Sequence, residues 1–324
     1  MTHISRNVNA MNTINERALI LGAGGFIGFH LCEALVKAEK TVRAFDQTIP
    51  ANLSSSLEWI KGDFHDKDTL YKAVVGCSTV YHLIATTLPA SSNDRPAYDA
   101  QTNILSTLQL LEIAVANGVK KVVFVSSGGT VYGITNPKPI KENHATNPIC
   151  AYGISKLAIE KYLHLYHHLY GLNYCILRVA NPYGANQKGT GVQGIIGTLL
   201  TKIMLGQPLE IWGDGMVVRD FIHIDDVTAA LVKAWDYHGS ESVFNIGSGQ
   251  GHSLNDLISK LEYLHGKPIE KHYTAARNLD VPYNVLDIRR AQEYLGWQPT
   301  ITLQDGIREL FMLFHSQCYR GSQG

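Results

Sequence analysis

The sequence is short of cysteine, of net charge and of long apolar runs. Its five cysteines are scattered through 324 residues without a CxxC pair, which disfavours a disulfide framework or a structural zinc site and favours a reducing compartment. Lysine and arginine number 28, as do aspartate and glutamate, so no net charge holds a nucleic-acid backbone or an anionic membrane non-specifically. No segment approaches the roughly 18 consecutive apolar residues of a membrane span, and the polar tail 1–16 lacks the apolar stretch of a secretory signal. We therefore expect a cytoplasmic protein with no nucleic-acid or membrane partner.

Short apolar runs alternate with longer segments of helical periodicity, which is the pattern of repeated βαβ units. The runs span 18–22, 41–45, 57–62, 78–84, 121–127 and 173–179. Each is apolar almost throughout rather than at every second position, as is typical of a parallel sheet covered by helices on both faces. We predict an α/β fold in which residues 17–180 form a Rossmann-type, doubly wound parallel sheet.

The chain changes character after residue 180, where glycine-rich loops and turn signals separate shorter elements. We expect residues 181–315 to form a smaller C-terminal substrate-binding α/β region, with strands near 217–250 returning to the first sheet. One helix is well marked there, because Ser253 stands at an N-cap position and Gly266 would end the helix.

Three glycines lie where the first predicted strand turns into a helix. Gly22, Gly25 and Gly28 form GxxGxxG within GAGGFIG, and without side chains they would let the backbone approach a pyrophosphate held on the amide groups of the helix start. The alternative is a tight turn that binds nothing. The agreement of strand, turn, helix and following strand favours a dinucleotide site.

Asp46 ends the second predicted strand and indicates which dinucleotide is bound. A carboxylate at this position can accept both ribose hydroxyls of adenosine and would repel a 2′-phosphate, which favours NAD over NADP. Arg43 should point elsewhere, because side chains three positions apart in a strand leave opposite faces. Asp63 follows the third strand and either faces the adenine or caps the next helix.

Tyr152 and Lys156 are four residues apart in a segment that predicts one helix up to Gly171, so their side chains leave the same face. A lysine ammonium beside the phenol would lower the tyrosine pKa from about 10 towards neutrality. Such a tyrosine can remove a hydroxyl proton while hydride leaves the carbon. Tyr263 and Lys267 have the same spacing, but we discard them because Gly266 interrupts their helix.

Together these motifs resemble the extended short-chain dehydrogenase/reductase family, and most closely its nucleotide-sugar epimerases. The resemblance covers roughly residues 17–315 and is carried by GxxGxxG, the acidic end of the second strand, SSGGTVYG, YxxxK, RVANPYG and RDFIHIDD. It implies that Tyr152 is the base and that Lys156 also binds the nicotinamide ribose of NAD. The implied reaction is 4-epimerisation of a UDP-hexose, either UDP-glucose/UDP-galactose or the N-acetyl forms, through a transient 4-keto sugar.

The segment before VYG departs from the family pattern. Where the family usually has a serine or threonine that binds the reacting hydroxyl, this chain has Gly128, so Ser127 or Thr130 would have to replace it, and both stay open. Gly129 and Thr130 stand where family dehydratases and uronate decarboxylases carry acids, so neither of those reactions has its acid. A nucleotide-4-keto-sugar reductase and a non-catalytic NAD-binding regulator remain alternatives.

The resemblance also implies the remaining site residues. It completes the cofactor set with Phe26, Ile27, Phe64, Leu83, Ala85 and Asn103. Its substrate set is Ser127, Asn181, Arg219, Arg277, Asp280 and Asn284. Asn284 would limit bulk at the second carbon of the sugar, where an N-acetyl group would fit. Arg219 has an alternative role, a salt bridge with Asp225 or Asp226.

Two features of the helix 151–170 complete the sequence-based expectations. His164, His167 and His168 are interpreted as a polar helix face rather than a metal site, because carboxylate partners at ligand spacing are few. In the resembling family this helix and the one over 98–117 form a four-helix interface, which favours a homodimer.

Overall fold

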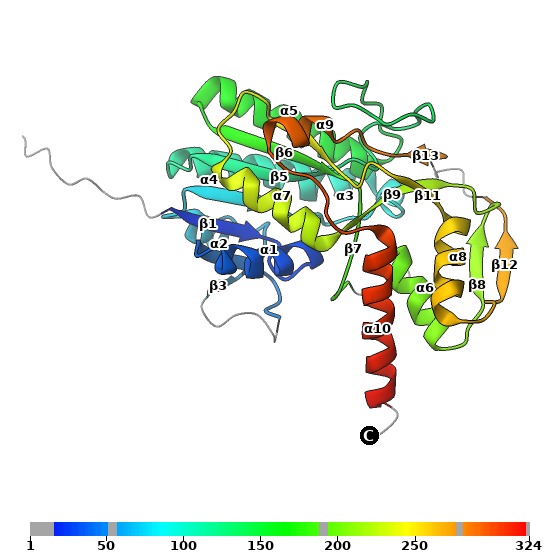
Figure 1. The fold of residues 1–324 in the computed structure, drawn as a ribbon. Helices are drawn as coiled ribbons and strands as arrows, with labels where there is room; N and C mark the ends of the chain where they lie inside the picture. The colour runs from blue at the N-terminus through cyan, green and yellow to red at the C-terminus, as the bar shows by residue number, and fades with distance from the viewer. Residues whose placement is uncertain (1–15, 51–56, 188–193, 277–280, 322–324) are drawn as a thin grey trace, which may run out of the picture.

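A seven-stranded parallel sheet forms the centre of the computed structural model, which describes residues 16–50, 57–187, 194–276 and 281–321 (Figure 1). Its strands are β1 (Arg17–Leu21), β2 (Thr41–Asp46), β3 (Glu58–Lys61), β4 (Thr79–His82), β5 (Lys121–Ser127), β6 (Asn173–Val179) and β10 (Val243–Ile246). They lie in the order β10-β6-β5-β4-β1-β2-β3. The order reverses between β1 and β4, and ligands of such sheets bind outside the carboxyl ends of the strands at this point.

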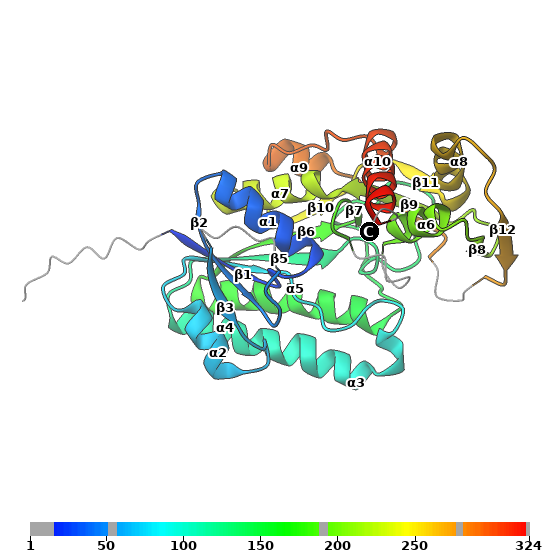
Figure 2. The same ribbon diagram turned by 90° about the horizontal axis from the view of Figure 1, so that it is seen from below.

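Helices cover both faces of this sheet (Figure 2). On one face lie α1 (Phe26–Lys37) and α7 (Ile224–Asp236); on the other lie α2 (Lys67–Val74), α4 (Ser106–Ala116) and α5 (Ala151–Tyr170). Each face has its own core of buried aliphatic side chains, with Leu31, Leu35, Val227 and Leu231 in the first and Leu70, Leu110, Ile159 and Leu163 in the second. The predicted Rossmann-type fold is confirmed.

The chain from Pro96 to Ala116 winds as one helical segment with a changed pitch. A short 3₁₀ helix η1 (Ser92–Asp94) precedes α3 (Pro96–Asp99), which continues into the π-helix η2 (Ala100–Leu105) and then into α4. π-Helical turns are rare and are often found at functional sites. This turn lies against α5.

The C-terminal region builds two smaller sheets beside the first (Figure 1). One contains β7 (Asn181–Tyr183), β9 (Val218–His223), β11 (Gly251–Ser253) and β13 (Tyr283–Asn284), and the other pairs β8 (Leu209–Trp212) with β12 (Lys271–Thr274). The helices of the region are α6 (Ile195–Met204), α8 (Leu254–His265), α9 (Arg289–Tyr294) and α10 (Leu303–Gly321). Of the segment 217–250 that we expected to return to the main sheet, β10 does so, whereas β9 belongs to a separate sheet.

A buried polar network joins β6 and β10 of the main sheet to α5. The Arg178 guanidinium of β6 pairs with Glu160 of α5 at 2.6 Å and donates to the hydroxyl of Tyr132 at 2.9 Å. That hydroxyl donates to the amide oxygen of Asn245 in β10 at 2.7 Å. Because each buried charge has a partner, the network joins three elements without leaving an isolated ion in the core.

The structure also bears on the expectations about cysteines and membrane spans. The four cysteines with described side chains, Cys32, Cys77, Cys150 and Cys175, are buried free thiols. Within the described ranges, every helix is too short or too polar to cross a bilayer.

The predicted caps of α8 are confirmed. The Ser253 hydroxyl accepts a hydrogen bond from the Asp256 amide at 3.0 Å, and the Asp256 carboxylate accepts one from the Ser253 amide at 3.0 Å. Gly266 ends the helix with φ 75°. Leu257, Ile258 and Leu261 then pack into the core of the C-terminal region.

Ser253→Ala is expected to lower the free energy of unfolding by about 1 kcal/mol, because the Asp256 amide at the helix start loses the hydroxyl that accepts its hydrogen bond. Denaturant titration followed by circular dichroism measures this change. Ser259→Ala is the matched control, since Ser259 is exposed in the middle of the same helix and alanine has the higher helix propensity. Equal losses in the two variants would contradict the capping role.

Candidate active site

The glycine turn between β1 and α1 is shaped by close backbone contacts. Gly22 has φ +89°, and its carbonyl accepts a hydrogen bond from the Gly25 amide at 3.1 Å. A Cβ atom on Gly28 would lie 2.0 Å from the Gly22 oxygen, so a side chain there would force the turn open. Gly25 is the N-cap of α1, and no side chain caps the helix or places a carboxylate in its first turn, which starts with Phe26 and Ile27. The amide groups of the helix start are therefore suited to an anion such as a pyrophosphate.

Asp46 lies beside this turn. Its carboxylate accepts hydrogen bonds from the Gly24 amide at 3.0 Å and the Gln47 amide at 2.7 Å. A Cβ atom on Gly24 would lie 2.6 Å from the Thr48 oxygen and 3.2 Å from the Asp46 carboxyl group. Arg43 points the other way, since its guanidinium donates to the carbonyl oxygens of Ala73 and Val75 at the end of α2. The expected separation of Arg43 from Asp46 is therefore confirmed.

Asp63 forms a local turn rather than a helix cap. Its carboxylate accepts hydrogen bonds from the amide of His65 at 2.9 Å and from the His65 ring at 2.7 Å, and the amide bond is the main cause of a lowered pKa for Asp63. Asp66 is the residue that caps α2, through the amide of Asp68. The alternative in which Asp63 caps this helix is therefore wrong.

The other expected cofactor residues line the carboxyl edge of the sheet near the switch point. Phe64 is buried against His82 at the end of β4. Leu83 continues β4, and its amide donates to the Leu21 oxygen at 3.1 Å. Ala85 follows in the same loop. Asn103, in the π-helical turn, accepts a hydrogen bond from the Thr86 amide at 3.0 Å, so its side chain holds this loop.

Tyr152 and Lys156 lie on one face of α5, as predicted. The Lys156 ammonium lies 5.6 Å from the centre of the Tyr152 ring and 4.7 Å from that of Phe124, and it donates to the Val125 oxygen at 2.9 Å. Lys156 is 4% exposed, and burial lowers its pKa to about 8.

The expected low pKa of Tyr152 is not found in this structure. Burial raises the pKa of Tyr152, and the nearby Cys150 and Asp99 raise it further. Burial is the main cause, and the Lys156 ammonium does not offset it, because it lies over the face of the ring and donates to the Val125 oxygen. A phenolate at Tyr152 therefore requires positive charge closer to its oxygen than Lys156 supplies here.

The turn after β5 brings Thr130 to the helix that carries Tyr152. A Cβ atom on Gly153 would lie 3.1 Å from that of Thr130. The Thr130 hydroxyl is buried and finds no hydrogen-bond partner among the described residues. Ser127 is partly exposed at the end of β5. At Gly128 a Cβ atom would lie 2.5 Å from a methyl group of Leu286, so that side chain occupies the space that a serine would need.

Three expected substrate residues come together on the small sheet around β9. The side-chain amide of Asn181 in β7 donates to the backbone carbonyl oxygen of Asp220 at 3.0 Å. Arg219 of β9 is paired in register with Asn284 of β13. Asn284 is 1% exposed and donates to the Gly128 oxygen at 2.9 Å, while its own amide oxygen is buried with no partner in the described part of the chain. Arg277 and Asp280 lie outside the described residues.

Arg219 donates to the Val281 oxygen at 2.6 Å. The two carboxylates considered as alternative partners have contacts elsewhere. Asp225 lies 3.7 Å from the His223 ring, and Asp226 accepts hydrogen bonds from the Thr300 amide and hydroxyl and from the Ile301 amide. Asp226 thus holds the turn before α10.

Asp220, which was not predicted as a site residue from the sequence, positions this sheet. Its buried carboxylate accepts hydrogen bonds from Ser248, Gly249 and Leu286, and burial raises its pKa. It therefore ties β9 to the loop after β10 and to the segment after β13. The sequence held one signal for it: the motif RDFIHIDD contains three aspartates, and none of them was assigned to the substrate.

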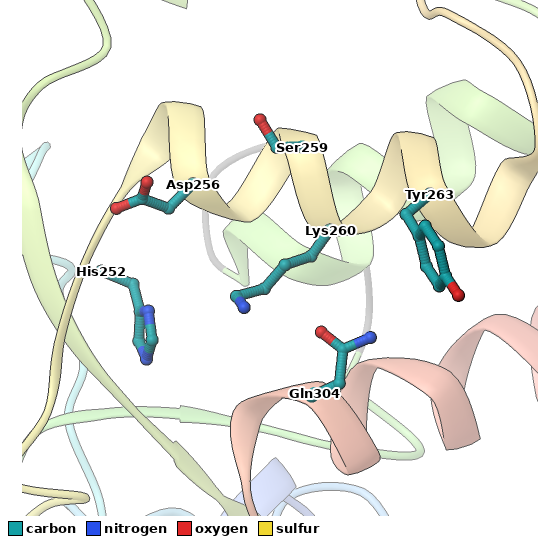
Figure 3. Close-up of a pocket in the computed structure, with 6 residues that line it drawn as sticks. All are labelled: His252, Asp256, Ser259, Lys260, Tyr263 and Gln304. Carbon is teal, nitrogen blue, oxygen red and sulfur yellow. The ribbon is translucent and has the colours of Figure 1, made fainter.

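An open groove of about 590 Å³ lies between α8 and α10 (Figure 3). It is lined by His252, Asp256, Ser259, Lys260, Tyr263 and Gln304. Tyr263 is 79% exposed on α8, and Gly266 has the left-handed conformation that ends this helix before Lys267. Tyr263 and Lys267 therefore do not share a helix, as expected.

Comparison with known proteins gives one family. The NAD dependent epimerase/dehydratase family matches residues 18–247. A UDP-glucose 4-epimerase of Mycolicibacterium smegmatis is 34% identical over 93% of this chain and 99% of its own length. A dTDP-4-dehydro-6-deoxyglucose reductase of Escherichia coli is 33% identical over 93% of this chain and 98% of its own length.

A solved structure agrees with the fold. The UDP-glucose 4-epimerase of Thermotoga maritima, crystallised with UDP-glucose, matches with a TM-score of 0.89 and 34% identity. The match covers 93% of this chain and 99% of that one.

Gly24→Ala is expected to lower the amount of dinucleotide retained on purification about tenfold, because the new methyl group clashes with the Thr48 oxygen and crowds the Asp46 carboxylate. Chromatography of the nucleotides released on denaturation measures it. Gly197→Ala in α6 is the control, since a Cβ atom there would meet only an oxygen 3.8 Å away. Parental retention in Gly24→Ala would contradict the assignment of this turn.

Proposed function

The chain belongs to the NAD-dependent epimerase/dehydratase family, and we propose that it is a UDP-hexose 4-epimerase acting on UDP-glucose and UDP-galactose or on their N-acetyl forms. The observation that carries the proposal is the buried Lys156 beside Tyr152 at the carboxyl edge of the sheet. The turn at Gly129 and Thr130, which carries no acid, supports epimerisation over elimination or decarboxylation.

The residues around the glycine turn fit NAD. The close approaches at Gly24 and Gly28 leave backbone rather than side chain facing the helix start, and the Asp46 carboxylate stands where a ribose diol would bind. NAD supplies an acceptor for the hydrogen at C4 of the sugar and gives the same hydrogen back. We assign Phe26, Ile27, Asp63, Phe64, Leu83, Ala85 and Asn103 to the walls of this site.

Tyr152 acts as the base in this proposal. Its oxygen takes the proton of the C4 hydroxyl during oxidation and returns it when the 4-keto sugar is reduced on its other face. Burial raises the pKa of Tyr152 in this structure, so in this proposal the phenolate is stabilised by a cation closer to its oxygen than the Lys156 ammonium is here. Lys156 is the buried cation available on the same helix face.

Asn181, Arg219 and Asn284 form the substrate side of the proposed site, together with Arg277 and Asp280. Arginine suits a diphosphate, because its planar guanidinium meets two phosphate oxygens at once. The buried amide oxygen of Asn284 can accept a hydrogen bond from a hydroxyl or an N-acetyl N–H group of the sugar.

A nucleotide-4-keto-sugar reductase is the second candidate, and it is favoured by the 33% identity to the Escherichia coli reductase. Both reactions use a tyrosine and a lysine in the same way. They differ in cofactor balance, since a reductase consumes one reduced cofactor for each product molecule and an epimerase consumes none.

We also propose that the chain is a homodimer that pairs through α5 and the helical segment 98–117 before it. Large apolar side chains are exposed there although they lie on helices: Tyr98, Leu105, Ile154, Leu165, Leu169 and Tyr170. Exposed apolar side chains gathered on neighbouring helices are typical of interaction surfaces.

Incubation of the purified protein with UDP-glucose, UDP-N-acetylglucosamine and UDP-glucuronate tests the proposed function. We expect interconversion of UDP-glucose with UDP-galactose, or of the N-acetyl pair, without added reduced cofactor. Stoichiometric loss of added NADH with a nucleotide 4-keto sugar would support the reductase instead. Absence of any product would contradict both.

Tyr152→Phe is expected to lower kcat about 10³-fold, because the base loses its hydroxyl while the ring keeps its packing. Product formation by chromatography measures kcat, and retained NAD at the parental level shows that the site is intact. Tyr162→Phe on the same helix is the control and should keep parental kcat. Unchanged turnover in Tyr152→Phe would rule out this residue as the base.

Two further substitutions distinguish the hydroxyls that can replace the one missing at Gly128. Thr130→Val removes a buried hydroxyl with little change of shape and is expected to lower kcat about 10²-fold. Ser127→Ala is expected to retain most of the activity, because Thr130 packs beside the helix turn that carries Tyr152. The reverse ranking of the two kcat values would assign the role to Ser127.

A further inference from the structure

Asp99 is a fully buried carboxylate that the proposed mechanism does not use. It is 0% exposed and ends α3 where the π-helical turn begins. Two hydroxyls donate to it in short contacts, Ser155 to one oxygen and Thr87 to the other, and the Asn103 amide donates at 3.2 Å. Since both oxygens act as acceptors, the group has the bonding pattern of an ionised carboxylate.

These partners belong to two parts of the proposed site. Ser155 precedes Lys156 on α5, so one oxygen of Asp99 holds the helix that carries the tyrosine and the lysine. Thr87 and Asn103 belong to the loop after β4 and to the π-helical turn, and Asn103 in turn binds the Thr86 amide. A single side chain therefore links the catalytic helix to the loop on the cofactor side.

Asp99 also supplies negative charge near Lys156. The anions that act on the Lys156 ammonium are Asp99 and Glu160. Glu160 is already paired, because Arg178 contacts it at 2.6 Å. His82, on β4, is neutral at working pH, since burial lowers its pKa to about 3. Asp99 has only neutral donors as partners in the described structure, so it is the anion whose charge is left to balance Lys156.

We propose that Asp99 is a positioning residue for the reaction: it fixes α5 against the loop after β4 through Ser155 and Thr87, and its charge stabilises the Lys156 ammonium. The inference rests on the proposed function, because it assumes that Tyr152 and Lys156 carry the chemistry.

The sign of the pH effect follows from the charge. The Asp99 carboxylate raises the pKa of Lys156 and also that of Tyr152, because an anion favours the protonated form of both groups. Loss of this charge therefore lets Tyr152 ionise and Lys156 lose its proton at lower pH. Glu160 and Cys150, the other groups that act on this pair, stay unchanged.

The test is the pH profile of kcat/KM for Asp99→Asn, which removes the charge and keeps the size. Both limbs of the profile are expected to shift to lower pH by about one unit, in addition to any loss of the plateau. Asp94→Asn is the matched control: it removes the same charge from an exposed position five residues away, where water screens it, and its limbs should coincide with those of the parent. Asp99→Asn limbs at the parental pH would overturn the proposal, whatever the height of the plateau.

A measurement without turnover separates failure of this inference from failure of the proposed function. The phenolate absorbance of Tyr152 is obtained by pH titration of the NAD-loaded protein, with the spectrum of the matching Tyr152→Phe variant subtracted. A lower ionisation midpoint in Asp99→Asn than in the parent supports the role of Asp99 even if no sugar is epimerised. Equal midpoints overturn it.

Ser155→Ala provides a second variant in case Asp99→Asn does not fold. It removes the hydroxyl that ties Asp99 to α5 and keeps the carboxylate. We expect kcat to fall about tenfold, because the helix carrying Tyr152 and Lys156 loses its register, with pH limbs and retained NAD at parental values. Parental kcat in Ser155→Ala would overturn the positioning role.

Discussion

The site depends on keeping one ammonium group, that of Lys156, buried in the protein. Its surroundings are Phe124, Tyr152 and the Val125 oxygen, and burial lowers its pKa to about 8. A buried cation is costly unless anions and dipoles compensate it. Asp99 supplies that charge from α3, which packs against α5, so the proposed catalytic pair is stable only within the complete fold.

A second constraint is the contact between the main sheet and the small sheet around β9. Asn284 binds the Gly128 oxygen, and Leu286 fills the space beside Gly128. Asp220 holds β9 to the segments that follow β10 and β13. The proposed sugar site therefore lies between residues that buried contacts hold together. The space that a side chain at position 128 would need is filled by Leu286, from the later part of the chain.

Local patterns in the sequence were sufficient to predict much of the fold and part of the candidate site. The parallel strands, the glycine turn, the caps of α8 and the shared face of Tyr152 and Lys156 each depend on residues close in the chain. Contacts across long separations could not be predicted: Ser155 with Asp99, and Asn284 with Gly128. The pKa of Tyr152 was predicted in the wrong direction because it depends on burial and on where the ammonium points, neither of which spacing determines. The assignment of β9 to a separate sheet likewise depends on tertiary pairing.

The most direct measurement is a crystal structure of the protein with NAD and UDP-glucose bound. We predict that the Tyr152 oxygen lies within hydrogen-bond distance of the C4 oxygen of the hexose, with the Lys156 ammonium on the nicotinamide ribose. A hexose bound elsewhere, or a Tyr152 oxygen directed away from both the sugar and the nicotinamide, would contradict it.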